Sequence, residues 1–231
     1  MREESRLRVA AFRPDDERLA DAVELLESLG ADPVPDPMLA VEPTDAAPRE
    51  DCDYVVLTSK TGVELAAQAG WNPGEATVCA IGDSTASALR EAGYPVDIVP
   101  EEFSSTGLVE ALETEVAGAR VEVARSDHGS AVLTDGLEDA GAYVHETILY
   151  RLVRPPAAGE SAEFAADGAL DAALFTSSLT VEHFLDAAEE RGIRADALEG
   201  ISEATVGVIG EPTKETAEAA GIHVDVVPER A

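Results

Sequence analysis

The chain has 231 residues, enough for one large or two small domains; 45% of them are hydrophobic and only 4% aromatic, so we expect a core of Val, Leu, Ile and Ala. Its 47 acidic and 16 basic residues give a net charge of −31, which excludes nucleic acid and anionic membranes as partners. No apolar run reaches the roughly 18 residues of a membrane span, and no signal-peptide-like apolar region precedes residue 7, so we expect a cytoplasmic protein.

The acidic residues are spread over the whole chain, and only two of the basic residues, Lys60 and Lys214, are lysines. This pattern predicts a salt-adapted protein, because at molar salt the Debye length falls to about 3 Å and self-repulsion is screened. The alternative is an ordinary acidic cytosolic protein. The two cysteines and four scattered histidines lack the spacing of a zinc site, so we expect no metal.

The first predicted elements are a strand over residues 7–12 and an amphipathic helix that ends at Gly30. Five prolines follow between residues 33 and 48. They argue against an interior helix or a central strand, so we expect an extended crossing segment there.

Short apolar runs then alternate with amphipathic helices up to residue 154, and the same alternation returns after residue 170. Expected strands are 53–59, 77–82, 96–100, 119–126, 143–154, 171–177, 205–210 and 224–228; expected helices are 61–69, 84–92, 104–117, 130–140, 180–191 and one after Pro212. This alternation predicts an α/β fold with parallel sheets in doubly wound layers.

Two proline-rich breaks, near residues 33–48 and 150–168, divide the chain. The first strand and helix are too small to form a domain alone, because the strand needs neighbours to bury both of its faces. We therefore expect residues 1–36 and 156–231 to form one discontinuous domain, residues 40–152 to form a second, and two strand-like connections to link them.

One phrase of the sequence occurs twice. Residues 77–101 and 205–229 are identical at 12 of 25 positions, including an Ile-Gly pair, a Thr three residues after that Gly and a Val-Asp-x-Val-Pro-Glu ending. A Thr-Ser pair at 58–59 is likewise echoed at 176–177. The repeat is either duplication of a stable unit or two copies that face each other across a site.

These repeated phrases place hydroxyl groups where a strand ends and a helix begins, the edge at which open α/β sheets bind ligands. Helix N-termini there suit carboxylates or phosphates. For each hydroxyl the alternative is a simple N-cap. Arg13, Lys60 and Arg125 also follow strand ends, and Arg grips carboxylates in bidentate fashion. The hydroxyl residues are Thr58, Ser59, Thr85, Thr176, Ser177 and Thr213.

Several catalytic signatures are missing from the sequence. It contains neither a G-x-G-x-x-G after a strand nor a P-loop, and it has no G-x-S-x-G elbow. A dinucleotide enzyme, an NTPase and an α/β-hydrolase therefore each lack their marker.

In its ordered set of motifs the chain resembles the uroporphyrinogen-III synthase family, as a salt-adapted, haloarchaeal-type member. The resemblance covers nearly the whole chain and rests on "FRP", "VLTSKTGV", "AIGDSTASALREAGYPVDIVPEEFSSTGLVEAL", "VEVARSDHGSAVLTDGLEDAGAYVHETILYRLV", "LFTSSLTVEHFL" and "VIGEPTKETAEAAG". It implies two flavodoxin-like domains, the first discontinuous in sequence, joined by a two-stranded linker with a cleft between them.

The resemblance also implies a reaction: cyclisation of hydroxymethylbilane, with inversion of its last ring, to uroporphyrinogen III and water, without metal or cofactor. Tyr150 matches the family's recurrent tyrosine, which assists departure of the substrate hydroxyl. Thr85, Thr213, Ser59 and Ser177 match binding positions, and we expect Arg13, Thr58, Lys60 and Arg125 to bind substrate too. We expect a monomer with this polycarboxylate tetrapyrrole as its only partner.

Two departures and two other functions have to be weighed. Phe12 stands where the family often has Thr, and Glu211-Pro212 brings a negative charge beside an anionic substrate. A non-catalytic two-domain protein that binds a polycarboxylate would show the same repeats. A response-regulator-like pair would need acidic partners and a Lys around Asp83, which the sequence does not offer. For Tyr150 the alternative is a packing role.

Overall fold

The computed structural model of the chain describes residues 6–14 and 16–228. The chain folds into two compact units, which we call unit 1 (Met1–Ala40 with Val153–Ala231) and unit 2 (Val41–Leu152). None of the helices in the described ranges is long and apolar enough to cross a membrane. Glu229, the last residue of the repeated phrase, lies outside the described residues.

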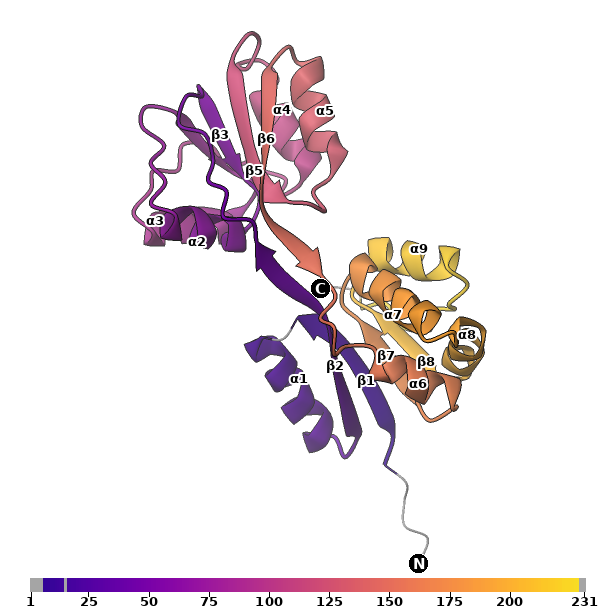
Figure 1. The fold of residues 1–231 in the computed structure, drawn as a ribbon. Helices are drawn as coiled ribbons and strands as arrows, with labels where there is room; N and C mark the ends of the chain where they lie inside the picture. Colours follow the sequence, from indigo (N-terminus) through magenta and orange to yellow (C-terminus); the bar gives the residue numbers. More distant parts are fainter. Residues whose placement is uncertain (1–5, 15, 229–231) are drawn as a thin grey trace, which may run out of the picture. The chain divides into compact units, whose positions relative to one another are not determined.

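Unit 1 is a parallel sheet in the order β2-β1-β7-β8. Helices α6 to α9 contribute to one core on one face of this sheet (Figure 1). Its elements are β1 (Arg8–Pro14), α1 (Glu17–Ser28), β2 (Asp32–Pro43), α6 (Glu160–Ala166), β7 (Ala172–Phe175), α7 (Ser178–Glu190), α8 (Arg194–Glu203), β8 (Thr205–Val208) and α9 (Glu211–Ala219).

Unit 2 is a second parallel sheet, in the order β4-β3-β5-β6. Helices α2 and α3 pack on one face and α4 and α5 on the other, each pair over its own apolar cluster (Figure 1). Its elements are β3 (Tyr54–Leu57), α2 (Lys60–Gln68), β4 (Thr77–Ala80), α3 (Asp83–Glu91), α4 (Ser105–Leu112), β5 (Arg120–Ser126), α5 (Ala131–Asp139) and β6 (Tyr143–Val153). The predicted α/β class with parallel strands is confirmed.

The repeated phrase folds the same way in both units. In unit 2 the Asp97 carboxylate accepts a hydrogen bond of 2.8 Å from the Val78 amide, and in unit 1 Asp225 accepts one of 2.8 Å from Val206. Residues 96–100 and 224–228, expected as strands, form only isolated bridges, Cys79 to Ile98 and Gly207 to Val226. The repeated Asp therefore holds the returning segment against the start of the strand.

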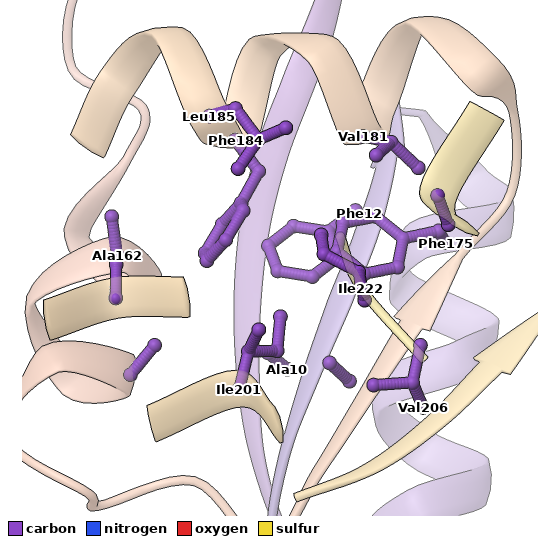
Figure 2. Close-up of a cluster of buried hydrophobic side chains, with 14 of the residues drawn as sticks. Ala10, Phe12, Ala162, Phe175, Val181, Phe184, Leu185, Ile201, Val206 and Ile222 are labelled. Carbon is purple, nitrogen blue, oxygen red and sulfur yellow. The ribbon is translucent and has the colours of Figure 1, made fainter. Parts of the chain in front are cut away.

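Aliphatic side chains fill most of the core, as expected, but unit 1 also concentrates aromatic rings. Three of the five phenylalanines of the chain meet there (Figure 2): the ring centroid of Phe12 lies 4.4 Å from that of Phe175 and 5.5 Å from that of Phe184. Around them pack Ala10, Val181, Leu185, Ile201, Val206 and Ile222. A Phe at position 12 is therefore a core residue, which explains one departure from the family pattern.

The proline-rich segment, expected to be extended but not a central strand, forms the edge strand β2 of the unit 1 sheet. Residues 32–43 form β2, which pairs with β1 in parallel register, Val9 opposite Pro33 and Ala11 opposite Pro35. Prolines at alternate positions all lack their amide on the same edge of a strand. The other edge keeps its donors, and the Asp32 amide donates to the carbonyl of Leu7 at 2.8 Å.

Two helices of unit 1 were not expected. The second break contains α6, and α8 lies between the expected helix 180–191 and strand 205–210. These two helices approach closely, since a Cβ built at Gly200 would lie 1.7 Å from the carbonyl oxygen of Ala165. Gly200 therefore fixes the packing of α8 against α6.

Replacing Gly200 with alanine is expected to destabilise the protein by about 3 kcal/mol, because backbone must move away from backbone. A mid-helix Gly→Ala change without this contact would stabilise by up to about 1 kcal/mol. The measurement is urea unfolding in high salt. Glu199→Ala, at an exposed position of the same helix, is the control and should change stability little; equal stability of both variants would contradict the packing argument.

Candidate active site

In unit 2 the predicted site residues lie at one edge of the sheet. The strands are parallel, so their carboxyl ends share this edge. Thr58 and Ser59 follow β3, Thr85 lies in the first turn of α3 after β4, and Arg125 and Tyr150 lie in the last parts of β5 and β6. The structure therefore brings these predicted site residues to one edge of the sheet.

Tyr150 and Ser59 contact each other directly, which the sequence analysis did not foresee. The Tyr150 hydroxyl donates to Ser59 Oγ at 2.9 Å, and Ser59 Oγ accepts a second hydrogen bond of 3.0 Å from the Gly62 amide as N-cap of α2. The tyrosine ring packs in the core under this helix and is 6% exposed. With both acceptor positions used, the Ser59 hydroxyl keeps its own proton to donate.

The helix that follows the first Ile-Gly phrase starts without a side-chain cap. Its N-cap is Gly82, so the first amides of α3 have no capping side chain, and such amides suit an anionic group. Thr85, in the first turn of α3, is buried, with 4% of its surface exposed. Phe103, 58% exposed, lies against Gly82, where a built Cβ would meet its ring at 3.1 Å. This exposed aromatic ring was not among the predicted site residues.

The structure does not support the predicted role of Arg125 in binding. Its side chain is 6% exposed, its Nε and Nη2 donate to the Glu146 carboxylate at 3.0 and 2.9 Å, and its Nη1 donates to the Ser130 carbonyl at 2.5 Å. A bidentate pair is costly to break when its guanidinium is buried, as that of Arg125 is. Arg125 thus holds the loop before α5 and is not free for a substrate carboxylate.

Unit 1 repeats the arrangement at the carboxyl ends of β1, β7 and β8. Ser177 caps α7 by accepting from the Thr180 amide at 3.3 Å, in a capping box with the Thr180 hydroxyl. Thr176 donates to the Phe12 carbonyl at 2.7 Å. Thr213, 4% exposed, lies in the first turn of α9 after an uncapped Gly210, as Thr85 lies in α3.

Arg13 lies at the end of β1 in unit 1. Its Nε is buried and has no hydrogen-bond partner among the described residues. A buried donor without an acceptor is costly, and a carboxylate is the acceptor that suits a guanidinium. Of the predicted cations, Arg13 therefore has the clearest need for an anionic ligand.

The two lysines of the chain each lie near the start of a helix. Lys60 begins α2 and is 3.6 Å from Glu64, with its side chain 62% exposed; Lys214 lies in the first turn of α9 and is 3.3 Å from Glu211. Lys214 was not among the predicted site residues, although its rarity in this sequence was a signal. It also offsets the charge of Glu211, the second departure from the family pattern.

Comparisons with known proteins agree with this arrangement. A family model described as "Uroporphyrinogen-III synthase HemD" matches residues 20–231. A protein of Methanothermobacter thermautotrophicus, named as a candidate uroporphyrinogen-III synthase, is 36% identical over 238 residues, which cover 96% of this chain and 92% of that protein.

Solved structures share the fold. A mutant uroporphyrinogen III synthase from the extremely thermophilic bacterium Thermus thermophilus has a TM-score of 0.68 at 21% identity, over 96% of this chain and 92% of that one. The uroporphyrinogen-III synthetase of Helicobacter pylori has a TM-score of 0.62 at 14% identity, over 97% and 93%. The family model and the archaeal relative go beyond fold: this chain belongs to the uroporphyrinogen-III synthase family.

Proposed function

We propose that this protein is a uroporphyrinogen-III synthase, a lyase that cyclises hydroxymethylbilane with inversion of ring D and releases water. Beside the family membership, the observation that carries the proposal is the Tyr150–Ser59 hydrogen bond of 2.9 Å at the carboxyl edge of unit 2. It joins a tyrosine hydroxyl to a serine at the N-cap of a helix, and the proton of that serine is free to donate.

This pair supplies what the departing group needs. The substrate hydroxyl leaves as water and must receive a proton, and a positioned acid of this kind contributes typically 10²–10⁴-fold to a rate. Ser59 would donate to the leaving oxygen while Tyr150 donates to Ser59. The proton would move along the two hydroxyls as the C–O bond of the substrate breaks and water forms, and the proton that the pyrrole ring loses at ring closure would return to Tyr150.

The remaining groups suit a substrate with many carboxylates. In unit 2 these are the uncapped amides of α3 and Lys60; in unit 1 they are Arg13, Lys214 and the start of α9. Thr58, Thr85, Ser177 and Thr213 would support the turns that present them. Because the linear substrate cyclises unaided to the wrong isomer, holding it in one conformation is the main task of the enzyme. Phe103 offers an apolar surface to a pyrrole ring.

A coupled assay in high salt tests the proposal. Porphobilinogen deaminase supplies hydroxymethylbilane, and the products are oxidised and separated as porphyrin isomers I and III. Isomer III should dominate only when the protein is present. If isomer I alone forms while circular dichroism shows the protein folded, the synthase assignment fails; tight binding of the substrate in that experiment would favour the non-catalytic polycarboxylate-binding protein instead.

We also propose that units 1 and 2 are the two domains expected from the sequence, and that the chain acts as a monomer in the cytoplasm. The division of the chain at residues 40–41 and 152–153 supports the first point. Analytical ultracentrifugation in high salt tests the second, with 24.1 kDa expected for one chain.

A further inference from the structure

A cavity of about 530 Å³ opens in unit 2 at the amino ends of β3, β5 and β6. This edge is opposite to that of Ser59 and Tyr150: six residue steps separate Asp53 from Ser59, about 20 Å in extended chain. The cavity plays no part in the proposed reaction. It is lined by residues 49, 51–53, 118, 120–122 and 143–145.

Glu122 is the unusual member of this lining. Its side chain is 0% exposed, although carboxylates are almost never fully buried unless paired. Oε2 lies 2.7 Å from His145 Nδ1, and Oε1 has no hydrogen-bond partner among the described residues. An ionised carboxylate accepts through both oxygens, and leaving one unpaired in a buried place is costly. Oε1 is therefore left without a donor, and Glu122 is among the residues that line the cavity.

The surrounding charges favour a positively charged donor. A neighbouring cavity of about 460 Å³ shares Asp51, Cys52, Asp53 and Arg120 with the first and adds Glu50 and Glu75. Across both cavities five carboxylates face two guanidinium groups. One of those, Arg120, is already engaged with Asp53 through its backbone amide at 2.8 Å and its Nη2 at 3.3 Å.

The thiol of Cys52 reports the same negative field. Burial first, and then the carboxylates of Glu122, Asp51 and Asp53, raise the pKa of this thiol to about 11. These carboxylates therefore produce a negative potential at Cys52. The same potential that disfavours the thiolate would stabilise a cation bound beside it.

We propose that this cavity binds a small molecule carrying a primary ammonium group, one N–H of which donates to Glu122 Oε1. A bare metal ion fits less well, because in the described ranges no three His, Cys, Asp or Glu side chains are placed to hold one, whereas a hard cation takes about six oxygen ligands. An ammonium group needs only directed acceptors and brings its own three donors. The net charge of −31 also concentrates cations near the surface.

The test is an amide NMR titration of the full chain at constant 1 M chloride, in which butylammonium replaces sodium. Saturable shifts are expected for residues 49–53, 120–122 and 143–145. Tetramethylammonium carries the same charge without an N–H and should cause none of them. Glu122→Gln should weaken butylammonium binding about 10-fold, the effect of losing a hydrogen bond between charged groups.

Two further variants complete the design. Glu138→Gln, an exposed position on α5 outside both cavities, should bind as the wild type does. Asp51→Asn, exposed on the rim, should weaken binding about 3-fold and decides the matter if Glu122→Gln fails to fold. Absence of saturable shifts, which would mean an ordered water alone meets Oε1, overturns the proposal. So would equal shifts with tetramethylammonium, or wild-type affinity in both cavity variants.

Discussion

Tyr150→Phe is expected to lower the kcat of isomer III formation about 100-fold, within the range set by loss of a positioned acid. The variant keeps the ring that packs under α2 and loses only the hydroxyl that donates to Ser59. Stability should fall by about 1 kcal/mol, the usual value of one hydrogen bond. The measurement is the coupled assay at saturating substrate, with urea unfolding of the same sample.

Tyr94→Phe is a matched control for this variant. Tyr94 also belongs to unit 2, and its hydroxyl donates to the Trp71 carbonyl at 2.9 Å, away from the carboxyl edge of the sheet. Its loss should cost similar stability and leave kcat unchanged. If Tyr150→Phe kept more than half of the wild-type kcat, the hydroxyl would be a packing feature, which is the alternative for this residue.

Variants of Ser59 distinguish its role in proton transfer from its role as the N-cap of α2. Ser59→Ala removes both the acceptor of Tyr150 and the N-cap of α2, so it should lower kcat and cost about 1 kcal/mol. Ser59→Thr keeps a hydroxyl that can do both and should restore most of the activity. An inactive but equally stable Thr variant would show that the hydroxyl acts only through a geometry unique to serine.

The sequence predicted well what depends on local pattern. Buried strands and amphipathic helices were recognisable because apolar residues recur with the spacing of the secondary structure that buries them. The duplicated phrase was recognisable from its identical residues. The role of the repeated Asp was not recognisable, since Asp97 and Asp225 act on amides 19 residues earlier in the chain. The repeat told us that the position matters, and only the structure shows what it contacts.

The failures also have physical causes. Helix α6 has few large apolar residues, and its packing depends on the missing side chain of Gly200, which a periodicity argument cannot weigh. Arg125 looked available because Glu146, its partner, lies on the adjacent strand β6, 21 residues away. The Tyr150–Ser59 bond spans 91 residues for the same reason. Contacts between site residues on different strands can be predicted only when the order and register of those strands are known.

Transfer from 2 M to 0.01 M salt is expected to remove on the order of 5–10 kcal/mol of stability, comparable with the whole stability of a typical domain. The net charge of −31 spread over 12332 Å² leaves roughly one uncompensated charge per 400 Å², so neighbours lie about 20 Å apart. The Debye length is about 3 Å at 1 M, 10 Å at 0.1 M and 30 Å at 0.01 M. Repulsion between neighbours is therefore negligible in the first case and nearly unscreened in the last.

The shape of the salt dependence separates screening from other effects of salt. Screening predicts that the melting temperature rises steeply up to about 0.3 M, where the Debye length becomes short against the charge spacing, and is then nearly flat. Exclusion of salt from the protein surface predicts instead a rise that continues above 1 M and is larger for sulfate than for chloride. A melting temperature that is constant from 0.01 to 2 M would mean that the acidic residues are those of an ordinary cytosolic protein. A steep rise at low salt would support salt adaptation as the reason for the scarcity of lysine. With so few basic side chains on the surface, repulsion between the acidic ones is reduced mainly by dissolved salt.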